Sequence, residues 1–499
     1  MQKKEPSGLA RGVWIMKVVN IPKLSIASFA RIVPEEAWQR FQGQMAEGRH
    51  ALAGRTVWNL NSNDSSGGVA ELLRSLVGYA NSVGADVRWG VVPGPPEFFA
   101  ITKRLHNALH GSRGDGSPLG SKEQRYYRRI LQSVTQDVVD KVNAGDLVIL
   151  HDPQTAGLAA PLVEKGAKVV WRCHIGCDWT SPEVERGWDF LEPFLEPAEY
   201  LIYSRRAYVP KRFADRPIAV IPPSIDPFSP KNQDLDPETV RSILEVSGLI
   251  RSASSRKPAV FHRSHGSIAE VRRKAYLPDG ASPPPPEAPL LLQVSRWDRL
   301  KDPVGVLAGF LRFVERSGDE QSHLMLAGPD VRGVADDPEG AEVLQEVTQL
   351  WRQLPNDFRS RIHLASLPMD DREENAAMVN ALQRHATIVI QKSMQEGFGL
   401  TVSEAMWKGR PMVVSGVGGI QDQVVHQECG WVLQDPADRE EYAAALEALL
   451  ADPDTAAKYG RQARKRVRDH FLSIRSLAQF AQLLVGLQHA TTMRWDDQG

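Results

Sequence analysis

The chain has 499 residues, more than one hydrophobic core normally holds, so two or three domains are expected. Its 60 Lys and Arg residues balance 61 Asp and Glu residues, which argues against nucleic acid or an anionic membrane as a partner. No apolar run approaches the ~20 residues that span a bilayer, no signal-type segment follows Met1, and three cysteines make no disulfide framework. These features favour a soluble, cytoplasmic enzyme.

The first half of the chain alternates predicted strands and helices after a poorly patterned arm, residues 1 to about 54. Residues 14–19 fit an extra edge strand. The main strands are predicted at 55–62, 87–92, 146–150, 168–171, 200–203 and 218–221. Intervening helices are predicted at 69–83, 97–109 and 122–142. This rhythm predicts a doubly wound α/β domain.

The turn Gly67–Gly68 joins the first main strand to its helix. It lacks the full glycine pattern of a dinucleotide site, so NAD is not predicted. Taken alone, the two glycines fit either a tight βα connection or a loop that approaches a ligand closely.

Polar residues follow two neighbouring strands of this half. His151 lies where the strand 146–150 ends, and it is either a structural residue bonded to a carbonyl or a ligand contact. Cys173, His174 and Cys177 might be read as zinc ligands, but zinc needs four and the other cysteine, Cys429, is distant. We therefore predict no metal site.

Residues 230–288 are expected to form an insertion between two domains. The insertion contains a basic stretch, 251–273, and ends in the stiff spacer Ser282–Pro286. The basic stretch could bind an anionic partner, but a solvated helix and loop is the favoured interpretation.

The second half repeats the βα rhythm from Pro289 onward. Strands are predicted at 290–294, 324–327, 362–365, 387–391, 412–414 and 431–433. Helices are predicted at 303–315, 340–354, 372–384, 400–408, 439–450, 454–469 and 475–488. This pattern predicts a second doubly wound domain.

Two cations follow the strand 290–294. Arg296 and Lys301 lie beyond its carboxyl end, where open α/β sheets bind their ligands, and Asp302–Pro303 begins the next helix. The planar fork of an arginine and the point charge of a lysine can together hold a diphosphate.

Two carboxylates flank the turn after the strand 387–391. Glu396 precedes Gly397-Phe398-Gly399, and Glu404 falls in the first turns of the following helix. The glycines let the backbone approach a ligand, and the helix N-terminus offers free N–H groups to an anion. Carboxylates that accept hydroxyl hydrogens beside amides that hold phosphate suit a nucleotide sugar; the alternative is two exposed glutamates.

These residues resemble the retaining glycosyltransferases of the GT-B fold, the family 4 type with its E-x7-E motif. Longer motifs resemble trehalose glycosyltransferring synthases and trehalose phosphorylases of that family. They are Trp58–Ser62, Gly67–Glu71, Glu97–Asn107, His151–Gln154, Trp171–His174, Ile221–Pro227, Ser229–Asn232, Gln293–Asp298 and Glu404–Gly409.

The resemblance implies two Rossmann-like domains that face a central cleft. Residues 1–229 would form the acceptor-side domain, 230–288 the insertion and linker, and 289–474 the donor-side domain, with 475–499 a helix that crosses back. Whether the chain forms a homodimer is left open.

The resemblance also implies roles for individual residues. Arg296 and Lys301 would stabilise the leaving diphosphate, Glu396 the sugar hydroxyls and Glu404 the ribose. The remaining donor contacts would come from Gly67, Gly68, Phe398, Gly399 and Leu400. His151 would contact the transferred sugar near its reactive carbon. The acceptor side would be lined by Asp152, Gln154, Arg172 and His174.

The expected reaction is retaining transfer of glucose from a nucleoside diphosphate glucose to a free sugar, glucose in the first instance, which gives trehalose. No cofactor is implied. The alternatives are a trehalose phosphorylase that uses phosphate, a sugar-nucleotide epimerase of the same fold, and a non-enzymatic sugar-binding protein. The last would be expected to lose Arg296, Lys301 or Glu396.

Overall fold

The computed structural model describes residues 14–64, 67–252, 257–331 and 338–488. Within them the chain forms two compact units, which are described separately. The first contains the residues up to Ser28, Glu36–Ile221 and the chain from Leu477; the second contains Phe29–Glu35 and Pro222–Ser476. Residues 230–288 thus lie within the second unit. No helix in the described ranges is long and apolar enough to cross a membrane.

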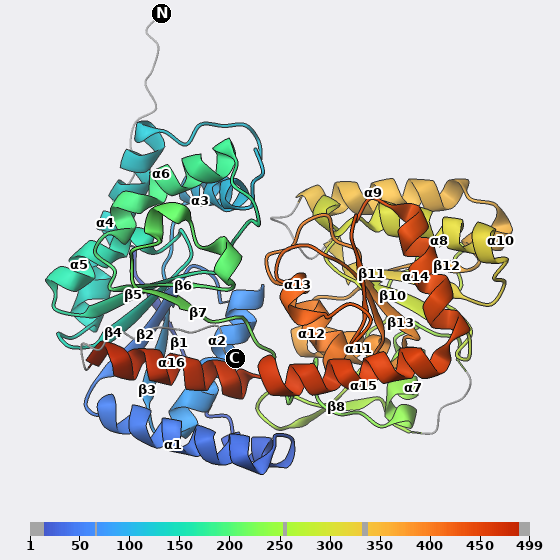
Figure 1. Cartoon of the computed structure of the whole chain (residues 1–499), viewed down its shortest axis with the longest axis horizontal. Helices are drawn as coiled ribbons and strands as arrows, with labels where there is room; N and C mark the ends of the chain where they lie inside the picture. The colour runs from blue at the N-terminus through green and yellow to red at the C-terminus, as the bar shows by residue number, and fades with distance from the viewer. Residues whose placement is uncertain (1–13, 65–66, 253–256, 332–337, 489–499) are drawn as a thin grey trace, which may run out of the picture. The chain divides into compact units, whose positions relative to one another are not determined.

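The first unit is built on a seven-stranded sheet in the order β1-β3-β2-β4-β5-β6-β7 (Figure 1). Only β1 pairs antiparallel, with β3, and the other pairings are parallel. The strands are β1 (Lys17–Val19), β2 (Thr56–Asn61), β3 (Asp86–Val91), β4 (Leu147–His151), β5 (Lys168–Cys173), β6 (Tyr200–Tyr203) and β7 (Ile218–Val220).

Helices cover this sheet, whose central strands β2 and β4 are buried along their whole length. They are α1 (Glu35–Ala51), α2 (Gly68–Ser82), α3 (Pro96–Leu109), α4 (Ser121–Lys141), α5 (Ala159–Glu164), α6 (Pro182–Leu195) and α16 (Ser473–Gln488). The helix α1 lies in the N-terminal arm, where an edge strand was predicted at 14–19 but no helix. Its buried side is a narrow stripe of Phe41, Met45 and Gly48, too sparse to give a clear helical period.

The second unit contains a six-stranded, wholly parallel sheet in the order β12-β11-β10-β13-β14-β15. Its strands are β10 (Leu290–Val294), β11 (His323–Pro329), β12 (Ile362–Leu367), β13 (Ile388–Gln391), β14 (Met412–Ser415) and β15 (Trp431–Leu433). The helices are α7 (Pro237–Val246), α8 (Pro303–Ser317), α9 (Pro338–Gln353), α10 (Asn356–Arg359), α11 (Arg372–His385), α12 (Leu400–Trp407), α13 (Ile420–Gln423), α14 (Arg439–Ala451) and α15 (Pro453–His470).

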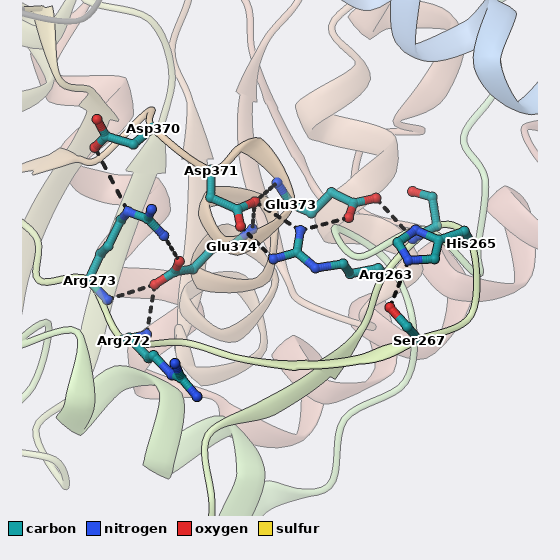
Figure 2. Close-up of polar contacts among 10 residues, drawn as sticks. Arg263, His265, Ser267, Arg272, Arg273, Asp370, Asp371, Glu373 and Glu374 are labelled. Atoms are coloured by element: carbon teal, nitrogen blue, oxygen red, sulfur yellow. Dashed lines mark hydrogen bonds and ion pairs between the residues drawn. The ribbon is translucent and has the colours of Figure 1, made fainter. Parts of the chain in front are cut away.

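A small hairpin in the second unit, β8 (Val260–His262) and β9 (Ile268–Glu270), is held to the start of α11 by ion pairs (Figure 2). Arg263 lies 2.5 Å from Asp371 and 3.0 Å from Glu373. Asp371 also caps α11, because its Oδ1 accepts backbone N–H groups of the first turn.

A buried carboxylate completes this attachment. Glu374 is 3% exposed, and its Oε1 accepts the backbone N–H groups of Arg272 at 2.7 Å and Arg273 at 2.6 Å, while the Arg273 guanidinium pairs with Oε2 (Figure 2). The described part of the basic stretch is therefore a hairpin that docks on α11, where a solvated helix was expected. Arg263 and Arg273 are neutralised inside the unit, which removes the charge argument for an anionic partner there.

Candidate active site

In the second unit, Lys301 and Glu396 come together at the carboxyl edge of the sheet. Lys301 ends a short 3-10 helix after β10, and its ammonium forms an ion pair with the Glu396 carboxylate on the loop after β13. The side chains are 15% and 13% exposed, so solvent reaches both. Gln293 fixes the turn, because its side-chain amide donates to the Lys301 carbonyl at 2.9 Å. A positive and a negative group are thus placed side by side at the edge where ligands bind.

Lys392 supplies a second, buried cation beside this pair. It directly follows β13, is 1% exposed, and forms an ion pair with Asp302. Asp302 has φ 49° and caps α8 by accepting the N–H of Gly305 at 3.0 Å. Sequence reasoning did not assign Lys392 a role. The available signal was a lysine placed immediately after a buried strand, where only a paired charge is tolerated.

Arg296 is more exposed than the other three charged residues predicted for this unit. Its side chain is 62% exposed and its Nη2 lies 3.2 Å from Asp298. An exposed guanidinium with a weak neighbouring pair is free to turn toward an arriving anion, since surface pairs of this kind contribute little stability.

The start of α12 has the geometry expected of a ligand loop. Gly399 has φ 83°, a conformation that favours glycine, and it precedes Leu400 without a side-chain cap on the helix. Phe398 lies in the same loop and is 6% exposed. The backbone N–H groups at this helix start therefore depend on something other than a capping side chain for a partner.

Glu404 is buried in α12, and its side chain is 4% exposed. Its Oε1 lies 3.4 Å from the ammonium of Lys231, which precedes α7 in the chain. Lys231 belongs to one of the motifs noted in the sequence, but no role was assigned to it. The pair places a cation beside a carboxylate at a buried position.

In the first unit, His151 and His174 form a hydrogen-bonded pair. Their rings are stacked at 5.3 Å, and His151 Nδ1 lies 3.0 Å from His174 Nε2. The other nitrogen of His151, Nε2, lies 3.1 Å from Asn59 Oδ1. Burial, with the nearby Arg172 charge, holds the pKa of both histidines well below the usual value, so both rings are neutral.

These contacts set the positions of the ring hydrogens. An amide oxygen only accepts, so His151 donates from Nε2 to Asn59 and must accept at Nδ1. His174 then donates from Nε2 and keeps Nδ1 as an acceptor. Both nitrogens of His151 are therefore engaged within the unit. The sugar contact of His151 stays a prediction, and the acceptor nitrogen that this pair leaves available is His174 Nδ1.

Asp152 shapes the loop that carries His174. It has φ 61°, and its Oδ1 accepts the backbone N–H of His174 at 2.7 Å. Burial raises the pKa of this carboxyl to about 7, against the opposing effects of the His174 N–H and the Arg172 charge.

The Arg172 side chain is buried inside the first unit. It is 1% exposed, Nη2 donates to the carbonyl of Ile221 at 3.2 Å, and the guanidinium lies 4.9 Å from the ring centroid of Phe480 on α16. Burial lowers its pKa to about 10. These contacts indicate a packing and electrostatic role, and they give no basis for the predicted acceptor contact.

The other predicted residues of this unit lie at turns. Gly67 has φ 89° and precedes α2, which begins at Gly68. Gln154 is half-buried in the turn after β4. Nowhere in the four described ranges do three or more His, Cys, Asp or Glu side chains gather as a metal site would require.

Two family models match the chain. Residues 59–210 match the N-terminal domain of trehalose synthase, and residues 280–466 match glycosyl transferases group 1. A trehalose synthase of Rubrobacter xylanophilus is 33% identical over 476 residues, covering 94% of this chain and 100% of that one. A trehalose phosphorylase of Pleurotus pulmonarius is 25% identical, covering 85% of this chain and 56% of that one.

Solved structures of similar fold align with the chain. An E. coli trehalose-6-phosphate structure bound with UDP-2-fluoro glucose aligns with a TM-score of 0.63 at 12% identity, over 86% of this chain and 99% of that one. The two parallel-sheet units and the matched domains define a glycosyltransferase of the GT-B fold. Within that class, the chain belongs to the trehalose synthase family.

Proposed function

We propose that the protein transfers a glucosyl unit, with retention of configuration, from a nucleoside diphosphate glucose to free glucose, giving trehalose. The observation that carries the proposal is the Lys301–Glu396 pair at the carboxyl edge of the second sheet. Lys301 is placed to meet a leaving phosphate, and Glu396 to accept hydrogens from the donor sugar. The trehalose synthase relatives support the choice of product.

The charge that develops on the leaving diphosphate is the largest electrostatic demand of this reaction. Lys301 supplies a partly buried positive charge, and Arg296 can swing from Asp298 to supply a second. Glu396 is released from Lys301 as both groups take up their ligand contacts. The leaving phosphate oxygen accepts the hydrogen of the incoming hydroxyl, whose oxygen bonds to the anomeric carbon on the face the phosphate leaves.

The nucleoside is assigned to the region of Glu404 and the start of α12. A carboxylate with two oxygens suits the two vicinal hydroxyls of a ribose. Lys231 lies 3.4 Å from Glu404 Oε1 and offsets its charge. The uncapped N–H groups after Gly399 suit phosphate oxygens.

On the first unit, His174 is assigned the sugar contact and His151 the positioning role. Asn59 and His151 hold His174 as a neutral ring whose Nδ1 accepts, which suits a hydroxyl hydrogen. Asp152 holds the His174 backbone.

A trehalose phosphorylase is the second candidate, because phosphorylases of this family match 85% of the chain. In that reaction phosphate would occupy the leaving-group position and the region of Glu404 would hold no ribose. The Glu404 carboxylate, whose two oxygens suit vicinal ribose hydroxyls, supports the nucleotide-dependent reaction.

Identification of the reaction products distinguishes the nucleotide-dependent synthase from the phosphorylase. The enzyme is incubated with ADP-, UDP- or GDP-glucose plus glucose, and separately with trehalose plus each nucleoside diphosphate or plus phosphate. We expect trehalose from at least one nucleotide glucose, and that nucleotide glucose from the reverse reaction. Glucose 1-phosphate from trehalose and phosphate, with no nucleotide reaction, would replace the proposal with the phosphorylase. No product in any arm would reject both.

A further inference from the structure

The second unit has a cavity of about 470 Å³ at the edge of the sheet opposite the candidate active site. It is lined by Thr387 and Ile388 at the start of β13, and by Pro411, which precedes β14. The candidate site lies beyond the other ends of these strands. The volume falls in the ~300–1,000 Å³ range of small-molecule sites.

The polar lining of this cavity is cationic. Arg410, Arg461 and His385 line it, and the described lining contains no Asp or Glu. Arg410 uses Nη1 to donate to the carbonyl of Ala386 at 3.1 Å, while its buried Nε has no hydrogen-bond partner among the described residues. Positive charge at this cavity is therefore not neutralised by its own wall.

The charged groups next to the cavity leave its lining positively charged. Arg384 also acts on Arg410, and both burial and this second arginine lower the Arg410 pKa. Burial, with the Arg410 and Arg241 charges, lowers the His385 pKa, so the positive charge of the lining comes from its two arginines. In the β8–β9 hairpin, by contrast, Arg263 is paired with two carboxylates.

The wall of the cavity is firmly held. Gly409 has φ 69°, and a Cβ on Gly460 of α15 would collide with the Gly409 carbonyl, so the loop and the helix are in direct backbone contact. Leu449 and Leu450 of α14 supply an apolar side. A preformed cavity with arginines on one side and leucines on another fits a ligand that carries an anionic group on an organic body.

We propose that this cavity is a second ligand site, separate from the candidate active site, for a small phosphorylated molecule. Arg410 and Arg461 bind the phosphate, and the organic part lies against α14 and α15. The proposal does not depend on which reaction the enzyme catalyses.

Titration calorimetry with inorganic phosphate, and with glycerol 3-phosphate as an organic phosphate, tests the site. Arg461 is exposed, so Arg461→Ala and Arg461→Glu should fold normally. We expect each probe to bind saturably, Arg461→Ala to weaken binding about tenfold, and Arg461→Glu to weaken it further. Lys465→Glu is the matched control, an exposed cation on the same helix outside the cavity lining, and should leave binding unchanged.

Lys301→Ala separates this site from the active site. Binding that survives Arg461→Glu but disappears in Lys301→Ala would place the anion at the leaving-group position and overturn the proposal. Absence of saturable binding by either probe would overturn it as well. Both readouts are binding measurements, so failure of the proposed glycosyl transfer would be seen separately.

Discussion

His151 in the first unit and Lys301 in the second both lie at the carboxyl edge of a parallel sheet, yet their surroundings differ. His151 is 1% exposed and its two ring nitrogens contact Asn59 and His174. Lys301 is 15% exposed and forms an ion pair with Glu396. At the first edge the His151–His174 pair is neutral and held in fixed hydrogen bonds, and at the second edge the Lys301–Glu396 pair is charged and reached by solvent.

The difference follows from burial. Without an opposite charge close by, a buried group gives up its own, as the lowered pKa of His151 and His174 indicates. The second edge keeps charge because each cation has a carboxylate beside it. A neutral edge suits sugar hydroxyls, and a charged edge suits a phosphate that gains charge as it leaves.

The largest expected effect comes from the charged edge. Lys301→Ala should lower turnover about 10²–10³-fold, because a charge-stabilising donor at the leaving group contributes about 3–4 kcal/mol. Steady-state kinetics measures this, with the melting temperature as a check on folding. Arg299→Ala is the matched control, since Arg299 lies two residues away and its pair with Glu346 is exposed. Near-normal turnover in folded Lys301→Ala would refute the diphosphate assignment.

The two glutamates should differ in kinetic signature. Glu396→Gln removes a contact to the sugar being transferred, so kcat should fall about tenfold or more, as expected for a hydrogen bond to a charged group. Glu404→Gln removes a ribose contact that ground and transition states share, so the donor KM should rise while kcat changes little. Equal changes in both constants for both variants would contradict this division of roles.

The neutral edge can be tested at Asn59. Asn59→Leu leaves His151 Nε2 without its acceptor, and we expect kcat to fall about fivefold, the effect of one ordinary hydrogen bond of about 1 kcal/mol. Asn59→Asp restores an acceptor oxygen and should recover ring orientation. A negative charge there should also raise the His151 pKa, so the pH–rate profile should shift, which a purely structural role would not produce. Full activity of a well-folded Asn59→Leu would show that this bond does not position the pair.

An effect of a different kind, on the pH dependence of stability, is expected at Asp152. Its carboxyl pKa is raised to about 7 in the folded chain from 3.8, so the folded state holds the proton more tightly than the unfolded state between these values. Its contribution to stability is complete below pH 3.8 and is lost as pH rises through about 7. Asn tolerates the positive φ and accepts the same N–H, so Asp152→Asn should keep the loop.

Chemical denaturation at several pH values checks this. The free energy of unfolding of Asp152→Asn, relative to the natural chain, should increase between pH 5 and pH 8. A difference that is flat or decreasing over that range would mean that Asp152 ionises normally in the folded protein.

Sequence alone determined the α/β class, the strand positions of the two large sheets, and Arg296, Lys301 and Glu396 as charged residues at the second sheet edge. These signals are local: apolar runs of strand length, a Gly-Phe-Gly turn, and cations directly after a strand. The pairing of Lys301 with Glu396 was foreseeable only in outline, because parallel strands bring their carboxyl ends to one edge.

Tertiary structure decided which of the other candidates face a ligand. The sequence marks Arg172 and His151 as polar residues at strand ends, but Arg172 packs on Phe480, 308 positions later, and His151 on Asn59, 92 positions earlier. Lys231 and Lys392 gained roles because each forms an ion pair with a carboxylate from another segment. No local pattern records such contacts, because a buried polar side chain takes its orientation from the partner that satisfies it.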